Sequence, residues 1–188
     1  MTYIILAAGK GNNLKPLTLK YPKTSYKLNS NETVLQHLVR SIRKYDDTAE
    51  VIVVLGYLAD AVKNELEYDN VKFIVNPFYE VTNSISSLWF AKQYLERENV
   101  TIIHGDVVFD EHIMKDILTI NTKNPFVLVD SSIKLDGAYN VVFDETKVVL
   151  MSKKLDNFDA KYACVSKLDA VSARLLKQEI NDMVNSNM

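Results

Sequence analysis

The 188-residue sequence contains a single cysteine, Cys164. A lone cysteine excludes a disulfide within the chain and suits a reducing compartment, so we expect a cytoplasmic protein. The sequence has no apolar run near the roughly 20 residues of a membrane-spanning helix, and its first residues lack the basic and apolar regions of a secretory signal peptide. We therefore expect no membrane partner.

An excess of charge of one sign is also lacking. The 22 lysine and arginine residues and the 24 aspartate and glutamate residues give a formal net charge of −2. Proteins that bind nucleic acid usually carry a basic excess, so we expect no nucleic-acid partner. Hydrophobic residues make up 47% of the chain. Because single domains typically contain about 100–200 residues, we expect one soluble globular domain over residues 1–188.

Strand-like and helix-like segments alternate along the chain. Short apolar runs predict strands, and apolar stripes such as Val34, Leu38 and Ile42 predict helices. The predicted strands are 2–7, 51–55, 71–76, 100–104 and 126–129, and the predicted helices are 33–45, 59–67, 84–96 and 111–122. After residue 136 the pattern changes to a hairpin of 139–143 and 147–152, a strand at 161–166 and a helix at 168–184. This order predicts an α/β fold of three layers, a mostly parallel sheet with helices on both faces.

Only five glycines are present, and two of them, Gly9 and Gly11, directly follow the first predicted strand. Glycine permits positive φ and a close approach of the backbone to a ligand. Successive N–H groups in such a loop form an anion-binding concavity. Lys10, Lys15 and Lys23 add positive charge. The loop therefore has the features of a nucleoside triphosphate site.

Two other glycine loops fit less well. A Walker A loop needs two glycines five residues apart, followed by lysine and serine or threonine, and this pair is absent here. A dinucleotide-binding loop needs a third glycine where this chain has Leu14, and an acid about 20 residues further on. The next strand ends instead at Gly56. A tight turn with scattered surface lysines remains the alternative for the two glycines by themselves.

The longer string resembles the signature of nucleotidyltransferases that make sugar nucleotides and CDP-alcohols. It runs Leu6-Ala7-Ala8-Gly9-x-Gly11, then Leu14-x-Pro16-Leu17-Thr18 and Pro22-Lys23. The resemblance implies a Rossmann-like nucleotidyltransferase fold in which the loop wraps the triphosphate. The implied nucleotide-binding residues there are Leu6, Ala7, Ala8, Gly9, Lys10, Gly11, Asn12, Asn13 and Lys23, and Lys23 is also implied to be catalytic.

One position departs from the family pattern. The family usually has an arginine where this chain has Asn13, and that arginine helps to hold the triphosphate. Asparagine supplies a hydrogen bond but no charge, so Lys10 or Lys15 would have to supply the charge.

A second signal lies at the end of the strand predicted at 100–104, where Gly105-Asp106 follows. In open α/β sheets, ligands bind outside the carboxyl ends of the strands. Mg²⁺ prefers one or two carboxylates together with substrate phosphates. The resemblance implies that Asp106 is a catalytic residue and the Mg²⁺ ligand, with Gly105 beside the nucleotide. The alternative is an ordinary turn or N-cap aspartate.

The third signal is the segment from Asn76 to Trp89. It resembles the Asn-x-x-Tyr…Asn-x-x-Ser segment of the phosphocholine cytidylyltransferase-like branch, which lies near the base and ribose. The implied nucleotide-binding residues are Asn76, Tyr79, Thr82, Asn83, Ser84 and Ser87. Cytosine presents one amino donor and two acceptors, which such side chains can read. The alternative is an Asn-Pro turn followed by an N-cap, and we expect Trp89 and Phe90 to be core residues.

Other residues carry weaker signals. His104 lies two residues before Asp106 on the same strand face and would border the site, although a structural role is favoured. We expect Cys164 to be a core residue. Lys153 and Lys154 follow a strand where sugar nucleotidyltransferases have a lysine that contacts the acceptor phosphate, but the local motif does not match. No histidine, cysteine or aspartate cluster has zinc spacing.

The resemblance implies transfer of CMP from CTP to a small phosphorylated, phosphonate or phosphoramidate acceptor, with release of pyrophosphate. Residues 1–130 would form the nucleotide-binding core and 131–188 the acceptor side. The partners would be CTP, or another NTP, and that acceptor; a homodimer is left open. The alternatives are uridylyl or thymidylyl transfer to a sugar 1-phosphate, and a non-catalytic nucleotide-binding domain.

The second metal-binding carboxylate of the family has no matching motif here. The usual cytidylyltransferase continues beyond the last helix to a segment with that aspartate. This chain would therefore be a shortened form or use another ligand, for which Asp156, Asp159 and Asp169 are the available acids.

Overall fold

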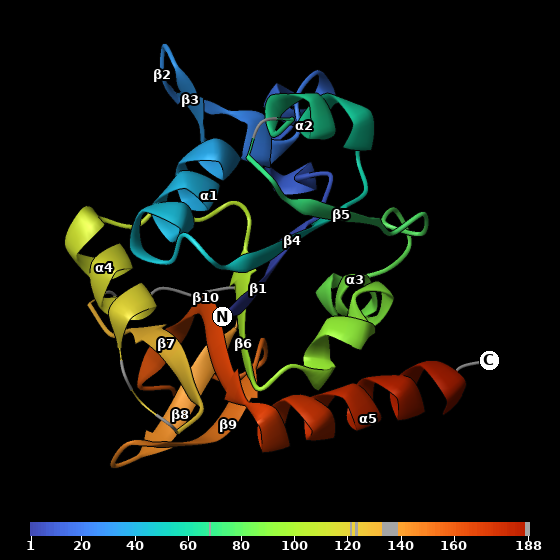
Figure 1. Cartoon of the computed structure of the whole chain (residues 1–188). Coiled ribbons are helices and arrows are strands. Elements are labelled where there is room, and N and C mark those ends of the chain that lie inside the picture. Colours follow the sequence, from blue (N-terminus) through green and yellow to red (C-terminus); the bar gives the residue numbers. More distant parts are fainter. Residues whose placement is uncertain (68, 121, 123, 133–138, 187–188) are drawn as a thin grey trace.

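The computed structural model describes residues 1–67, 69–120, 122, 124–132 and 139–186 (Figure 1). One sheet of eight strands has the order β5-β4-β1-β6-β10-β8-β9, and β7 also pairs with β10. The strands are β1 (Thr2–Ala7), β4 (Glu50–Leu55), β5 (Lys72–Val75), β6 (Asn99–His104), β7 (Phe126–Asp130), β8 (Asn140–Asp144), β9 (Lys147–Ser152) and β10 (Ala160–Asp169). The first four of these in the chain, β1, β4, β5 and β6, pair in parallel, and the last four pair antiparallel.

Helices cover both faces of the sheet, as Figure 1 shows. One face packs against α1 (Val34–Tyr45) and α4 (Glu111–Thr119), and the other against α3 (Ser84–Phe90) and α5 (Ala170–Ser186). The short helix α2 (Ala59–Glu65) contributes Val62 to the first core. The predicted three-layer α/β fold is confirmed. None of the described helices is both long and apolar enough to cross a membrane.

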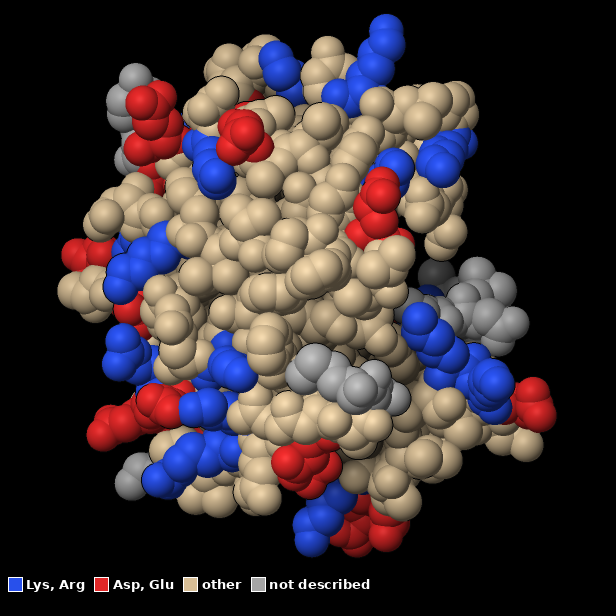
Figure 2. Space-filling view, turned by 90° about the vertical axis from the view of Figure 1, so that its right-hand side faces the viewer, with Lys and Arg blue, Asp and Glu red and all other residues tan. Residues whose placement is uncertain are grey.

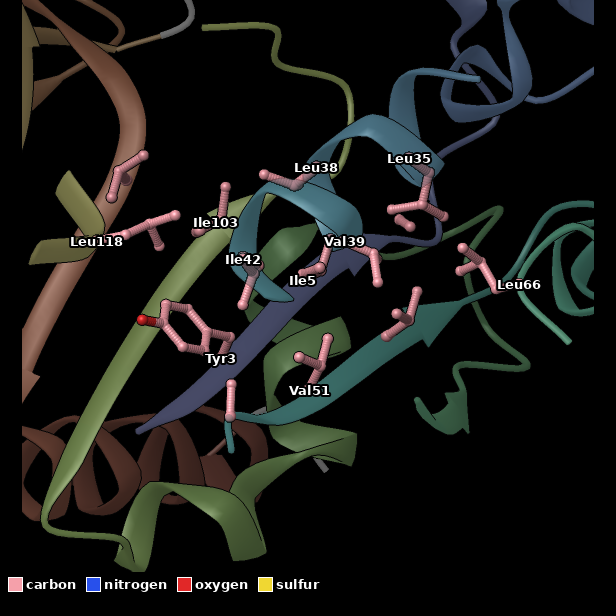
Figure 3. Close-up of a cluster of buried hydrophobic side chains, with 14 of the residues drawn as sticks. Tyr3, Ile5, Leu35, Leu38, Val39, Ile42, Val51, Leu66, Ile103 and Leu118 are labelled. Carbon is pink, nitrogen blue, oxygen red and sulfur yellow. The ribbon is translucent and has the colours of Figure 1, made fainter. Parts of the chain in front are cut away.

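The core forms where the apolar runs of the sequence meet. Tyr3 and Ile5 from β1 lie under Leu38 and Ile42 from α1, and all four side chains are at most 1% exposed (Figure 3). The helix begins at a capping box, in which Thr33 accepts from the Gln36 backbone and the Gln36 side chain accepts from the Thr33 backbone. Such a cap satisfies two backbone donors that a helix start leaves free.

Charged side chains are mixed on the surface. On the face shown in Figure 2, lysines and arginines lie among aspartates and glutamates around a largely uncharged central area. This face therefore presents no extended basic patch, in keeping with the small net charge of the sequence.

Most predicted boundaries agree with the structure within two residues, and the exceptions have local causes. The helix predicted at 84–96 is two elements, because Ala91 leaves helical geometry and separates α3 from the 3-10 helix η4 (Lys92–Glu96). The last strand runs on to Asp169, so α5 begins two residues later than predicted. The helix predicted at 111–122 ends three residues earlier, at Thr119, because Ile120 leaves helical geometry. The change of pattern after residue 136 falls on residues outside the described ones.

The segment between β1 and α1 was expected only as a loop. It contains three 3-10 helices, η1 (Asn12–Leu14), η2 (Leu17–Leu19) and η3 (Lys23–Ser25), and a small hairpin of β2 (Lys27–Asn29) and β3 (Glu32–Thr33). These short elements carry no apolar periodicity of their own, so the sequence pattern does not distinguish them from a loop.

Candidate active site

A cleft opens where the carboxyl ends of β1 and β6 meet the segment that leads from β5 into α3. Leu6 of β1 is the register partner of His104 of β6, so the loops that follow both strands leave the sheet at the same edge. The cleft has a volume of about 150 Å³. It is lined by Leu6, Ala8, Gly9, Lys23, Tyr79, Thr82, Asn83, Ser84, Ser87, His104 and Asp106. Ten of these eleven residues are among the nucleotide-binding or catalytic residues predicted from the sequence.

The glycine loop turns sharply out of β1. Gly11 has φ 68° and ψ 44°, a left-handed conformation that favours glycine, and a Cβ there would lie 2.9 Å from the Thr18 side chain. The Thr18 hydroxyl donates to the Gly11 carbonyl at 2.8 Å and holds the turn. Gly9 has more room, since a Cβ would meet only Lys23, at 3.7 Å. The loop geometry therefore requires glycine at position 11.

The two residues predicted to be catalytic lie together in the cleft. Lys23 begins η3 and Asp106 follows β6, 83 residues further along the chain, and the Lys23 ammonium donates to the Asp106 carboxylate. Their side chains are 28% and 29% exposed, so both are accessible to a ligand. The pair places one cation and one oxygen ligand at the same point of the cleft.

Lys10 is not a lining residue, but it follows Gly9 in the chain and its partner Glu80 follows Tyr79, and both Gly9 and Tyr79 line the cleft. We refer to this edge of the cleft as its mouth. Its ammonium donates to Glu80 at 2.9 Å and lies 5.5 Å from the centre of the Tyr57 ring. The hydrogen bond to Glu80 is the main cause that raises the pKa of Lys10. Tyr57 in turn lies against Tyr79, with ring centres 6.2 Å apart. The sequence pattern did not indicate either partner, because Glu80 occupies an unspecified position of the Asn76–Trp89 segment and Tyr57 lies outside every motif.

The other loop residues fall outside the lining. Ala7 and Gly105 are buried beneath the cleft floor, and Asn12 and Asn13 are exposed on η1. Gly105 donates to the Leu6 carbonyl at 2.9 Å and so joins the ends of the two strands.

Asn76 has a different place from the one expected. Its side chain is fully buried, and its amide donates to the Thr82 hydroxyl at 3.1 Å and the Ser87 hydroxyl at 3.0 Å. Its carbonyl oxygen accepts from the Phe78 backbone at 2.9 Å. Because this side chain is used on protein groups and does not line the cleft, we revise its role from direct contact to positioning Thr82 and Ser87.

Asn83 is both a cleft-lining residue and the N-cap of α3. It lines the cleft, and its side chain caps α3 by accepting from the backbone of Ile85 and Ser86 at 3.0 and 3.3 Å. The sequence left open whether this residue is a cap or a ligand contact, and the structure makes it a cap that borders the cleft. Ser84 and Ser87 follow on the first turns of α3 and point their polar face to the cleft.

The segment from Tyr79 to Ser87 forms one wall of the cleft, and this wall packs closely against the glycine loop. A Cβ at Gly56, the residue after β4, would lie 2.6 Å from Tyr79 and 2.7 Å from the Ala8 carbonyl. Tyr57 donates its backbone N–H to the same Ala8 carbonyl at 3.1 Å. Gly56 therefore lets Tyr79 pack at the site, a role that its place at a strand end could have indicated.

The floor of the cleft contains His104. Burial lowers the pKa of this imidazole, which favours its neutral form. Its ring stands edge-on to Tyr162 of β10 at 6.1 Å, and the Tyr162 hydroxyl is 2.8 Å from that of Ser166. Cys164, between these two, has φ 64° at an irregularity of β10, and burial raises the pKa of its thiol to about 11. A thiol held protonated is a poor nucleophile.

Trp89 and Phe90 at the end of α3 pack against other aromatic and apolar side chains. Trp89 is partly buried against the second core and donates to Asn181 of α5 at 3.1 Å. Phe90 stands edge-on to Trp89 and stacks on Phe78. The contacts of Trp89 confirm the core role predicted for it. Phe90 is half-buried and packs on these aromatic neighbours outside both cores, so the core role predicted for it is not confirmed.

Within the described ranges, no three or more histidine, cysteine, aspartate or glutamate side chains gather as a metal-binding group. Asp106 is the carboxylate in the cleft lining. Asp159 accepts from the Phe143 backbone, and Asp169 accepts from the Ser172 backbone at the start of α5. Neither lines the cleft, and Asp156 does not line it either.

A family model of the MobA-like NTP transferase domain matches residues 3–135, the part of the chain that forms the cleft. The chain belongs to the MobA-like NTP transferase family. A CTP:phosphoglutamine cytidylyltransferase of Campylobacter jejuni is 33% identical over 137 residues, which cover 69% of this chain and 52% of that protein. A 2-aminoethylphosphonate cytidylyltransferase of Lancefieldella rimae is 35% identical over 117 residues, covering 60% of this chain and 46% of that protein. The chain thus spans about half the length of these curated relatives.

Solved structures share the fold of this chain. The CTP:phosphocholine cytidylyltransferase of Streptococcus pneumoniae superposes with a TM-score of 0.77 at 22% identity, over 99% of this chain and 78% of that chain. The inositol-1-phosphate CTP transferase of T. maritima gives a TM-score of 0.70 at 22% identity, over 93% and 72%. At this identity the likeness establishes the Rossmann-like fold alone.

Proposed function

We propose that this chain is a cytidylyltransferase that moves CMP from CTP to a small acceptor bearing a phosphate, phosphonate or phosphoramidate group. The observation that carries the proposal is the Lys23–Asp106 pair in a cleft walled by a glycine loop and by hydroxyl side chains. The named relatives that use CTP support the choice of nucleotide.

The reaction is an in-line displacement. An anionic oxygen of the acceptor forms a bond to the α-phosphorus of CTP, and the bond from that phosphorus to the bridging oxygen breaks, so pyrophosphate leaves. This chemistry needs positioning and charge neutralisation more than covalent help from the protein. The backbone N–H groups of the loop at Gly9 and Gly11 would hold the phosphates, and Lys23 would neutralise charge that moves onto pyrophosphate.

Asp106 suits Mg²⁺ as a ligand. Its carboxylate is accessible and, among the described residues, it is not part of a larger group of metal-binding side chains. Mg²⁺ commonly takes one or two carboxylates from the protein and its other ligands from phosphates and water. When bound, Mg²⁺ would supply positive charge to the phosphate oxygens. Lys23 would then exchange its present carboxylate partner for a phosphate.

The wall formed by the start of α3 would face the base. Thr82 and Ser87 have their hydroxyls oriented by the buried Asn76 amide, and Asn83 and Ser84 stand beside them. Oriented hydroxyls can donate to the cytosine carbonyl or accept from its amino group. A fixed wall of this kind would distinguish cytosine from larger purines.

Pyrophosphate release, measured with each NTP and Mg²⁺ against a set of acceptors, tests the proposal. The set contains 2-aminoethylphosphonate, phosphoglutamine, phosphocholine and several sugar 1-phosphates. We expect acceptor-dependent release with CTP. Release with UTP or dTTP and a sugar phosphate would contradict the choice of nucleotide. NTP binding without release under any condition would indicate a non-catalytic domain.

A further inference from the structure

Lys23 in the cleft lining and Lys10 in the glycine loop are each held by a carboxylate from another segment of the chain. Lys23 pairs with Asp106, and Lys10 pairs with Glu80 at 2.9 Å. Glu80 lies on the turn between β5 and α3, 70 residues from Lys10, and its side chain is 58% exposed. The ion pair therefore links the glycine loop to the wall that carries Tyr79 and Thr82.

We propose that Glu80 competes with the triphosphate for Lys10: its carboxylate pairs with Lys10 beside the cleft, and an incoming triphosphate replaces that carboxylate as the partner of Lys10. The inference rests on the proposed function, because it takes the glycine loop as the triphosphate site. It adds a residue at a position that the signature motif leaves unspecified, and a charge exchange that accompanies nucleotide entry.

The contacts around Lys10 make this exchange feasible. The ammonium also lies over the Tyr57 ring, and the Tyr57 hydroxyl donates to the Leu19 carbonyl at 2.9 Å. Tyr57 is thus fixed to the same loop region and keeps Lys10 near the mouth after Glu80 is released. Attraction between a cation and the face of an aromatic ring does not compete with a phosphate for the hydrogen-bond donors of lysine.

Charge gives the exchange its direction. A triphosphate carries several negative charges, whereas Glu80 carries one, so Lys10 gains attraction when the triphosphate replaces the carboxylate. The same carboxylate repels the nucleotide at the mouth of the cleft. Glu80 therefore weakens the binding of any nucleotide whose phosphates reach Lys10. The effect is largest for a triphosphate, because it carries the most negative charge.

Glu80→Gln tests this, with CTP, CDP and CMP affinities measured by isothermal titration calorimetry at low salt. Glutamine keeps the size of the side chain and loses its charge. We expect CTP to bind about two- to fivefold more tightly, the range that corresponds to an exposed ion pair. The gain should be smaller for CDP, absent for CMP and absent at high salt, because salt screens exposed charges.

Two further variants separate this role from a general effect of charge. In a Lys10→Met background, Glu80→Gln should lose most of its effect, because the exchanged cation is gone. Glu96→Gln is the matched control: Glu96 also pairs with a lysine, Lys177 of α5, its side chain is 61% exposed, and it is absent from the cleft lining. We expect Glu96→Gln to bind CTP as the unmodified protein does.

Unchanged or weaker CTP binding by Glu80→Gln would overturn the inference. So would an equal gain in Glu96→Gln, or an undiminished gain without Lys10. The proposed function is tested separately, because its failure would leave the unmodified protein without pyrophosphate release even if CTP binds. An unmodified protein that binds no NTP would overturn both.

Discussion

At the scale of single residues, the cleft depends on charges that are already paired before a ligand enters. Lys23 and Asp106 neutralise each other, although each would serve a different part of a metal-nucleotide complex. A partly exposed pair of this kind contributes at most about 1 kcal/mol to stability. Each residue can therefore be substituted, or can change its partner when a ligand binds, without loss of the fold.

Asp106→Asn should abolish Mg²⁺-dependent pyrophosphate release while the melting temperature stays nearly unchanged. The amide keeps the shape of the carboxylate but cannot offer the same charge to a cation. Pyrophosphate release and thermal unfolding measure the two effects. Asp60→Asn, at a 94% exposed site on α2, is the control and should leave both unaltered. Activity retained in Asp106→Asn would make Asp106 a turn residue.

Asn13→Arg should tighten CTP binding and raise kcat/KM several-fold, because a guanidinium on the glycine loop can form charge-assisted hydrogen bonds to phosphate. Asn12→Arg is the matched control, since Asn12 is the neighbouring exposed residue of the same 3-10 helix. Calorimetry and pyrophosphate release should separate the two variants. An equal gain from both would mean that only net charge matters.

At the scale of elements, the wall of the cleft is built by one turn and the first turns of α3. The buried amide of Asn76 joins them, since it donates to a hydroxyl in each. An asparagine followed by proline indicates a turn, and the structure has a turn at this point. Its burial depends on the packing of α3 onto the sheet, which the local sequence does not specify.

Asn76→Ala should cost about 1–3 kcal/mol in free energy of unfolding, because it leaves two hydroxyls and a backbone N–H without their buried partner. Urea denaturation measures this cost, and CTP affinity in the same variant should also fall. Asn64→Ala, at an exposed position of α2, should change neither quantity appreciably. A stable Asn76→Ala protein with weakened CTP binding would instead point to direct contact with the nucleotide.

At the scale of the whole molecule, the order of strands brings the two main signals together. β1 and β6 are neighbours in the sheet although about 90 residues separate them, and this places the glycine loop beside Asp106. Parallel pairing makes both loops leave from the same edge of the sheet. The site is therefore a product of sheet topology rather than of any single segment.

Nucleotide binding should protect the whole fold against heat. We expect CTP with Mg²⁺ to raise the melting temperature more than ATP, GTP or UTP with Mg²⁺, because a ligand that binds only the native state stabilises it by mass action. Mg²⁺ alone should have little effect, since Lys23 occupies the Asp106 carboxylate. Differential scanning fluorimetry measures these shifts. Equal protection by all four nucleotides would argue against base recognition by the α3 wall.

Local patterns in the sequence determined the strands, the helices and the residue types of the cleft. Apolar periodicity is set by burial on one face of each element, and the glycine loop is set by backbone sterics at Gly11, so both can be read over short windows. The placement of Gly9, Lys23, Thr82 and Asp106 in one cleft agrees with the sequence prediction, although their roles toward a ligand remain predictions.

Only the tertiary structure decided which distant groups meet. The pairing of Lys10 with Glu80 and the ring contact of His104 with Tyr162 each join segments that no motif connects. The burial of Asn76 and its hydrogen bonds to Thr82 and Ser87 depend on how α3 packs, although all three residues belong to one motif segment. The sequence pattern predicted the hairpin of β8 and β9 and the strand β10, but it did not indicate that an irregular β10 pairs with β6, β7 and β8. Such contacts arise when whole elements pack, and their partners are chosen by three-dimensional proximity rather than by spacing along the chain.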